Sequence, residues 1–193
     1  MQVITDNASN CRRMGRLMQK DYPSIMWTPC ASHCIDLLME DIGKLSWVKE
    51  VVEIATSIVT FFTTKVKVLA IFREHSTKEL KKPSSTRFAY MWLLLERLFD
   101  VKNSLRMTVV SPAWNAWEDA GTQEARDMSI QVLNESFWEQ VRGIFIAVTP
   151  LYRVLRMTDM EGATLGLLLH FMREAKTELE ACTAITPERW HDI

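Results

Sequence analysis

Gln2-Val3-Ile4-Thr5-Asp6-Asn7, followed some twenty residues later by Ile25-Met26-Trp27-Thr28, is the stretch that decides the fold of this chain. The residues of both segments are typical of short strands, and the first segment runs directly into turn-forming residues. Between them, Ser9 to Tyr22 carries apolar side chains at helical spacing, with Ser9 or Asn10 as the expected cap. One amphipathic helix between two strands predicts a crossover connection, and therefore a parallel pair.

A second helix is expected directly after the second strand. Pro29 suits the first position of a helix, and the apolar residues that follow have helical spacing: Cys30, Cys34, Leu37, Leu38 and Ile42. The order is then strand, acid, helix, strand, helix. Asp6 stands at the carboxyl end of the first strand, the edge at which open α/β sheets gather ligands and metals.

From Ser46 onward the pattern is almost wholly helical. One apolar stripe runs from Trp47 to Phe62, and a further helix is expected over 163–182. Pro150 is expected to kink a long helix, and Asp119 to Met128 reads as a loop or an exposed helical turn. The predicted fold is mostly α with a small α/β part. Its expected division is an α/β segment at 1–45 and a helical region at 46–193.

Composition excludes some classes of protein. The chain has 193 residues and a net charge of −1, so no global basic field gathers nucleic acid. A local basic face is expected from Lys65, Lys67, Lys78, Lys81 and Lys82, which lie close together in the sequence. No apolar run approaches the roughly 20 residues that a bilayer requires, and the start lacks a basic-then-apolar leader. These features predict an intracellular protein, not secreted and without a membrane, with four reduced cysteines.

Asp6 is the sharpest candidate for chemistry. A carboxylate at the end of a strand can bind Mg²⁺, which takes one or two protein carboxylates and keeps several waters. Two such metals clamp the attacking and leaving oxygens in nucleases. The simpler alternative is an Asx-turn residue that only closes the strand.

Cys30 and His33 are one helical turn apart and can face the same side. A structural zinc site normally needs four ligands at recognisable spacing, so no tightly bound zinc is predicted here. Arg87 suits a phosphate or a carboxylate through its planar guanidinium, and Phe88 offers a ring for stacking on a base. The alternative for that pair is a solvent-facing arginine before a core phenylalanine.

Three motifs together resemble the catalytic core of hAT-superfamily transposases of the plant type. They are Thr5-Asp6-Asn7-Ala8-Ser9-Asn10, the stretch from Trp27 to Leu37, and Thr86-Arg87-Phe88, with a weaker echo from Thr149 to Trp190. The resemblance implies a ribonuclease H-like core followed by a helical insertion. It implies that Asp6 is the second of three metal-binding acids, with Mg²⁺ as cofactor, and that Cys30 and His33 support it. It also implies DNA contact by Arg87 and Phe88, where the family commonly has Arg-Trp.

The resemblance also sets expectations about what lies outside the chain. The first acid is expected on a strand upstream of Val3, and the last beyond Trp190, so the chain is expected to be catalytically incomplete. The implied function is a transposase-derived protein of the nucleus that binds DNA. The alternative is a non-enzymatic helical module that binds a protein partner or a second copy of itself.

Overall fold

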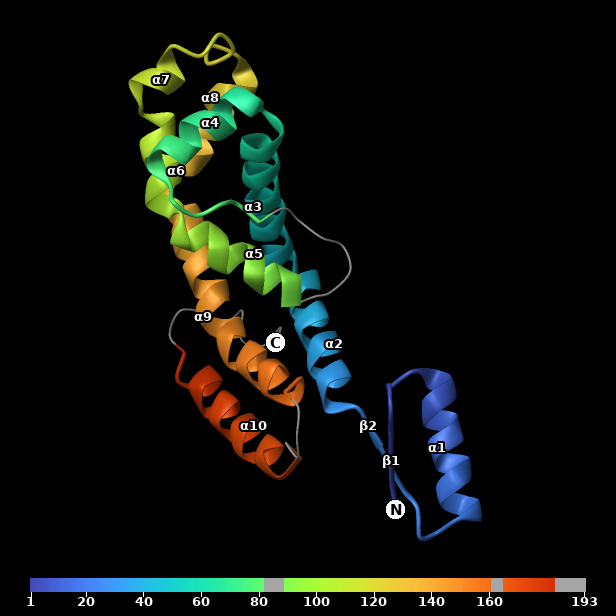
Figure 1. The fold of residues 1–193 in the computed structure, drawn as a ribbon. Helices are drawn as coiled ribbons and strands as arrows, with labels where there is room; N and C mark the ends of the chain where they lie inside the picture. The colour runs from blue at the N-terminus through green and yellow to red at the C-terminus, as the bar shows by residue number, and fades with distance from the viewer. Residues whose placement is uncertain (82–88, 161–164, 183–193) are drawn as a thin grey trace. The chain divides into compact units, whose positions relative to one another are not determined.

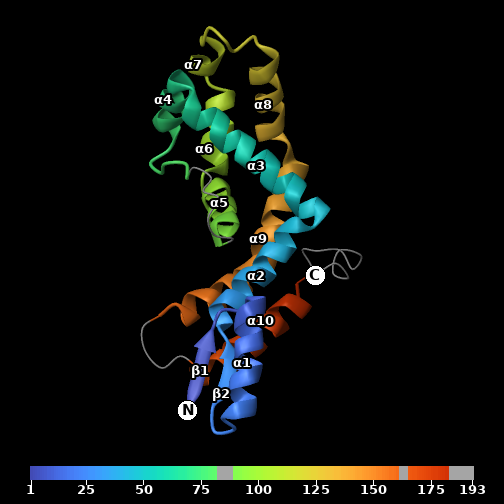
Figure 2. The same ribbon diagram turned by 90° about the vertical axis from the view of Figure 1, so that its right-hand side faces the viewer.

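The computed structural model describes residues 1–81, 89–160 and 165–182 (Figures 1 and 2). Helices dominate the described residues, and two short strands form a parallel pair, so the predicted fold class, mostly α with a small α/β part, is confirmed. The elements in chain order are β1 (Gln2–Thr5), α1 (Ser9–Asp21), β2 (Met26–Pro29), α2 (Ala31–Lys44), α3 (Ser46–Thr64), α4 (Val66–His75), α5 (Ala89–Asp100), α6 (Lys102–Val109), α7 (Pro112–Asn115), α8 (Gln123–Leu133), α9 (Glu135–Thr158) and α10 (Leu165–Glu180).

Strands β1 and β2 pair in parallel with Val3 opposite Trp27 and Thr5 opposite Pro29. Side chains alternate between the two faces of this small sheet. On one face, Gln2 Nε2 donates to Thr28 Oγ1 at 2.8 Å. On the other, Trp27 Nε1 donates to Thr5 Oγ1 at 2.9 Å. These two bonds fix the register and the direction of both strands.

Helix α1 covers the Trp27 face of the sheet, and both views show it lying along the strands. Its buried residue is Gly15. A Cβ added at Gly15 would lie 2.8 Å from Cε2 of Trp27 and closer still to Cγ and Cδ2. The indole therefore packs directly on the helix backbone, and only glycine leaves room for it.

The second strand and the second helix begin slightly later than the sequence predicted. The strand is Met26–Pro29 instead of 25–28, and α2 starts at Ala31 instead of Pro29. The backbone N–H groups of Met26 and Cys30 donate to β1, to Met1 O and Thr5 O. In a strand, the N–H groups of alternate residues point to the same side, so those of Met26, Thr28 and Cys30 point toward β1. The nitrogen of Pro29 points to the opposite, unpaired edge of β2, where the missing N–H removes no hydrogen bond between the strands.

The chain divides into two compact units. Among the described residues, the first comprises 1–42 and 149–181, and the second comprises 43–148. The division predicted at 45 lies close to the first boundary. However, the end of α9 and helix α10 group with the amino-terminal residues, which the sequence pattern did not indicate. Side-chain contacts hold this first unit together: Ser32 Oγ donates to Thr158 Oγ1 at 2.8 Å, and Arg153 pairs with Glu178 at 3.0 Å.

An aromatic cluster forms the core of the second unit. The ring of Trp114 lies 6.1 Å from that of Phe62 in a stacked arrangement and 5.4 Å from that of Trp117. Phe72 meets Phe62 edge-on at 6.1 Å. Such pairs add about 0.5–1.5 kcal/mol each beyond the area they bury. Trp138 is also fully buried, and its indole N–H donates to Val132 O at 2.7 Å.

Residues 119–128 were expected to form a loop or an exposed helical turn, but the structure has a helix, α8, over Gln123–Leu133. It begins after Thr122, whose hydroxyl accepts from Ala125 N at 3.3 Å, and it buries Ala125 and Val132. Pro150 lies inside α9, which is one helix from Glu135 to Thr158.

No single helix among the described residues is long and apolar enough to cross a membrane. Helices α3 and α4 satisfy that test only as a pair bent by 101°.

Candidate functional site at the end of strand β1

Asp6 directly follows β1, at the carboxyl end of the strand. Its side chain is exposed, and its Oδ1 accepts a hydrogen bond from Ala8 N at 3.1 Å. This bond is the Asx turn that the sequence offered as the simpler reading, and it leads the chain into α1. Because Oδ1 makes this bond, Asp6 has a fixed orientation beside the first turn of the helix.

Thr5 anchors the peptide before Asp6 to both neighbouring segments. Its hydroxyl accepts from the Trp27 indole, and its carbonyl accepts from Cys30 N at 2.7 Å. The chain then enters α2, where Cys34 N donates to Cys30 O at 3.1 Å. Backbone and side-chain bonds therefore bring Cys30 and the start of α2 to the carboxyl end of β1.

Two side chains act on the charge of Asp6. A hydrogen bond from the Cys11 thiol is the main reason that the pKa of Asp6 lies below its usual range. The N–H of Ala8 lowers this pKa further, as does the nearby charge of His33, while partial desolvation opposes them. Asp6 is therefore a carboxylate at neutral pH. The same bond to Asp6 raises the pKa of the Cys11 thiol, which keeps the thiol protonated as a donor.

Sequence reasoning missed Cys11, because its spacing with Met14, Leu17 and Met18 placed it on the apolar face of α1. The signal available was its position five residues after Asp6, in the first turn of the helix that the Asx turn introduces. A thiol in that turn can reach back to the acid. Cys11 is in fact half-buried between the helix and the strand end.

The other predicted site residues are brought together only in part. Cys30 and His33 lie at the start of α2, both half-buried, and His33 is near enough to influence Asp6 electrostatically. Burial is the main cause of a raised pKa at Cys34, followed by the proximity of Cys30. Arg87 and Phe88 lie outside the described residues. Within the described part of the chain, no three His, Cys, Asp or Glu side chains gather closely enough to hold a metal ion.

Asp6 is suited to bind Mg²⁺ directly as one of its ligands, but it does not make a metal site by itself. An ionised, exposed carboxylate with one oxygen outside the Asx turn is a suitable oxygen donor. A two-metal centre for phosphodiester cleavage needs several carboxylates, and no group of three or more His, Cys, Asp or Glu side chains able to hold a metal forms among the described residues. Cys11 and His33 suit a supporting role, as hydrogen-bond donor and nearby charge.

Two of the five lysines of the basic face predicted around residue 70 are paired with acids. Lys65 Nζ pairs with Glu124 at 3.0 Å, and Lys78 Nζ pairs with Asp100 at 2.8 Å. Lys82 lies outside the described residues. Lys65 and Lys78 lie close in the sequence, but they pair with acids on two different helices, α8 and α5. The prediction of one continuous basic face is therefore wrong for these two lysines.

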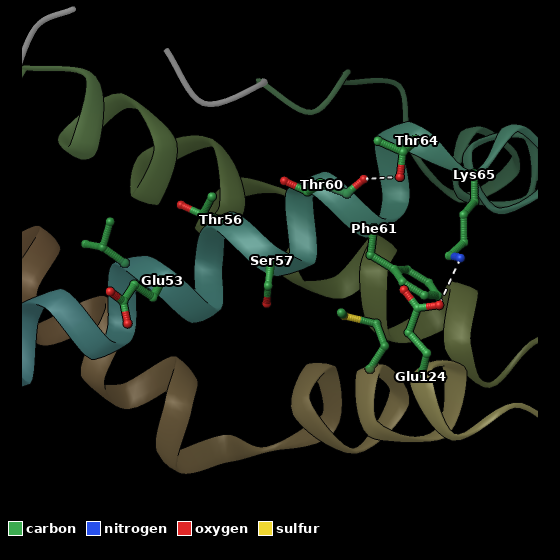
Figure 3. Close-up of a pocket in the computed structure, with 10 residues that line it drawn as sticks. Glu53, Thr56, Ser57, Thr60, Phe61, Thr64, Lys65 and Glu124 are labelled. Atoms are coloured by element: carbon green, nitrogen blue, oxygen red, sulfur yellow. Dashed lines mark hydrogen bonds and ion pairs between the residues drawn. The ribbon is translucent and has the colours of Figure 1, made fainter. Parts of the chain in front are cut away.

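A groove of about 580 Å³ lies between α3 and α8 in the second unit (Figure 3). Hydroxyl-bearing residues of α3 line it, and the Lys65–Glu124 ion pair closes one end. Lys65 Nζ also lies 5.0 Å from the centre of the Phe61 ring. The lining residues are Val52, Glu53, Thr56, Ser57, Thr60, Phe61, Thr64, Lys65, Glu124 and Met128. Apart from the Lys65–Glu124 ion pair, the lining consists of apolar and hydroxyl side chains and one acid, Glu53, a composition that favours binding.

A family model described as a domain of unknown function, DUF659, matches residues 1–58 of the chain. The matched region holds β1, α1, β2, α2 and the first part of α3, and so contains Asp6, Cys11, Cys30 and His33. No curated protein and no solved structure matches the chain. The matched family thus coincides with the β–α–β–α segment that builds the candidate site.

Proposed function

We propose that this chain is a transposase-derived protein, related to the hAT type, that binds DNA and does not cleave it alone. The observation that carries the proposal is the β–α–β–α segment with an ionised Asp6 at the carboxyl end of its first strand. The DUF659 match over the same residues supports it, because that domain occurs in transposase-like proteins of plants. The segment is compatible with a ribonuclease H-like core, and such a role places the protein in the nucleus.

Asp6 has a defined part in this proposal. It supplies one carboxylate oxygen to a Mg²⁺ ion, and when bound the ion supplies positive charge for a phosphate oxygen. Cys11 holds the carboxylate in place, and Cys30 and His33 fix the start of α2 beside it. Arg87 and Phe88 are proposed contacts to DNA. No cleavage step is assigned to these residues, because one carboxylate does not make a two-metal site.

The test is a titration of labelled duplex DNA with the full chain, with and without Mg²⁺, followed by fluorescence anisotropy. We expect binding that Mg²⁺ strengthens, because the ion bridges Asp6 and a phosphate. Asp6→Asn retains an oxygen for the Ala8 N–H but removes the charge. It should abolish the Mg²⁺-dependent part of binding and leave the Mg²⁺-independent part unchanged. A parallel incubation with Mg²⁺ or Mn²⁺ should yield no cut DNA.

Two results would contradict the proposal. An absence of DNA binding at low salt would remove its basis, since electrostatic contacts to phosphates are strongest there. Cleavage that Asp6→Asn abolishes would show instead that the chain is a complete nuclease.

A second candidate function is a helical module that binds a protein partner or a second copy of the chain. The groove between α3 and α8 favours it, because apart from Glu53 and the Lys65–Glu124 ion pair its walls combine apolar and hydroxyl side chains. Grooves of this kind accept an amphipathic helix. In that case the duplex titration would show no binding, and sedimentation of the chain would show association.

A further inference from the structure

Helix α1 presents a row of positive charge to solvent. Arg13, Arg16 and Lys20 are three and four residues apart, so they share one face of the helix. Arg12, four residues before Arg16, borders the same face. All four side chains are exposed. Within residues 1–81, 89–160 and 165–182, no ion pair joins any of them to a carboxylate.

The row lies opposite the face that holds α1 on the sheet. The packed face carries Cys11, Gly15 and Met18, which are spaced four and three residues apart. Gly15 lies against the Trp27 ring, and Cys11 donates to Asp6. The cations therefore make none of the contacts that position α1, and the fold does not explain them.

Positive charge is concentrated on this helix relative to the rest of the chain. Helix α1 contains four of the 23 lysines and arginines but only one of the 24 acids, Asp21 at its end. The remaining residues have 19 cations against 23 acids. A local field of this kind attracts an anionic partner even though the whole chain is slightly acidic.

We propose that this row, Arg12, Arg13, Arg16 and Lys20, docks on the phosphate backbone of duplex DNA. The proposal rests on the proposed function for the choice of DNA, and it deepens that function by naming the surface. Three of the four cations are arginines, whose planar fork matches a phosphate bidentately. At 1.5 Å per residue the row is about 12 Å long. That length of duplex carries roughly seven phosphates on its two strands together, or three to four on one strand, which is close to the number of cations in the row.

Other anionic partners fit the row less well. A membrane-surface helix inserts a broad apolar face between lipids, but Cys11, Gly15 and Met18 of α1 face the sheet, and only Met14 and Leu17 are large exposed apolar residues of this helix. Single-stranded nucleic acid is usually held by aromatic side chains between the cations, and α1 contains none. A protein partner would need a central apolar or aromatic anchor, whereas the centre of this face is Arg16 with cations on both sides.

The surface also leads toward Asp6. Helix α1 begins three residues after Asp6, and the row starts at Arg12, in the first turns of that helix. A duplex lying along the row therefore passes the end of α1 at which the carboxylate stands. The helix amino terminus adds a partial positive charge there.

The experiment compares two triple variants of the full chain with the same change of charge. Arg13→Gln/Arg16→Gln/Lys20→Gln removes three of the four cations of the row and leaves Arg12. Lys67→Gln/Arg142→Gln/Arg156→Gln removes two arginines and one lysine that are exposed on other helices. Anisotropy with a labelled duplex is measured from 50 to 200 mM salt without Mg²⁺, and circular dichroism checks that each variant is folded. Duplex RNA and anionic vesicles are measured alongside.

A plot of the log of the DNA association constant against log salt concentration has a negative slope, to which each phosphate contact contributes about −0.9. We expect the slope of the α1 variant to be shallower by about 2.7, because three such contacts are removed. The same relation makes its affinity at 0.1 M salt about 500-fold weaker. The control variant should bind as the unaltered chain does. Single variants Arg13→Gln and Arg16→Gln should each reduce the slope by about 0.9, and they provide the test if the triple variant does not fold.

Two outcomes overturn this inference and leave the proposed function standing: DNA binding that the α1 variant retains, and an equal loss in both triple variants. The absence of any duplex DNA binding by the unaltered chain overturns both proposals. Binding confined to duplex RNA or to vesicles likewise assigns the row to another partner and refutes the DNA surface.

Discussion

At the scale of single residues, the position of Asp6 depends on the close packing of Gly15 in α1 against Trp27 in β2. Gly15 lets the Trp27 ring lie on the backbone of α1, and Trp27 in turn donates to Thr5, the residue before Asp6. Cys11, one turn before Gly15 on the same helix, donates to Asp6 itself. A substitution at Gly15 should therefore shift Asp6 through Trp27, Thr5 and Cys11.

Gly15→Ala should destabilise the first unit. The added Cβ would overlap the indole ring, because it would lie closer to the ring atoms than van der Waals contact allows. Helix α1 or Trp27 must therefore move. Overpacking of this kind costs about 1–3 kcal/mol. Chemical denaturation followed by Trp fluorescence measures the loss. Gly166→Ala is the matched control, because a Cβ there meets nothing within 4 Å, and it should be neutral or slightly stabilising. Equal stability of the two variants would show that Trp27 does not constrain α1.

At the scale of elements, local sequence signals predicted β1 at its observed bounds and β2 to within one residue. The alternation of β-branched and turn-forming residues is a local property, and so is the helical spacing of α3. Helix α8 was missed because its segment is polar, and its burial of Ala125 and Val132 depends on distant partners. The thiol of Cys11 and the outward row on α1 were missed for a related reason: the spacing of a helix does not say which face the sheet will cover.

The start of α9 shows how one acid joins two helices. Glu135 pairs with Lys102 at 2.8 Å and also with Arg106, both on α6. Hydrogen bonds from these two cations, Lys102 first, hold the pKa of Glu135 below its usual range. A lowered folded pKa means that the stabilisation is fully present above the ordinary glutamate pKa of about 4.3. It is lost as the pH falls from there through the lower folded value.

Glu135→Gln should remove that pH dependence. Thermal unfolding of the unaltered chain should show stability falling on acidification below about pH 4.3, and the variant should show a smaller fall over the same window. At pH 7 the variant should be slightly less stable, since exposed ion pairs contribute little. Glu139→Gln, on the same helix one turn later and also exposed, should leave the pH profile unchanged. Identical profiles for the unaltered chain and Glu135→Gln would refute the role of this pair.

At the scale of the whole molecule, the two units differ in how completely they bury their apolar residues. In the second unit, α3 alone buries Val48, Val51, Ala55, Ile58, Val59, Phe61 and Phe62. In the first unit, Ile4 is 54% exposed and Met26 is 57% exposed, on the face of the sheet that α1 does not cover. Two strands without further neighbours are marginal in water. The parallel pair therefore depends on α1 and on the Thr5 and Trp27 bonds.

Hydrogen exchange should report this difference directly. Amides of Val51–Phe62 in α3 and of Met91–Phe99 in α5 lie in helices with many buried side chains, so exchange there should require large-scale unfolding. Amides of Val3–Thr5 and of Met26–Thr28 should exchange through local opening, faster by orders of magnitude, because little apolar surface is exposed when that pair separates. The same experiment in the presence of duplex DNA should slow exchange across α1 and leave α5 unchanged. Strands that exchange more slowly than α3 would mean that the sheet, and not the aromatic cluster of the second unit, is the most stable part of the chain.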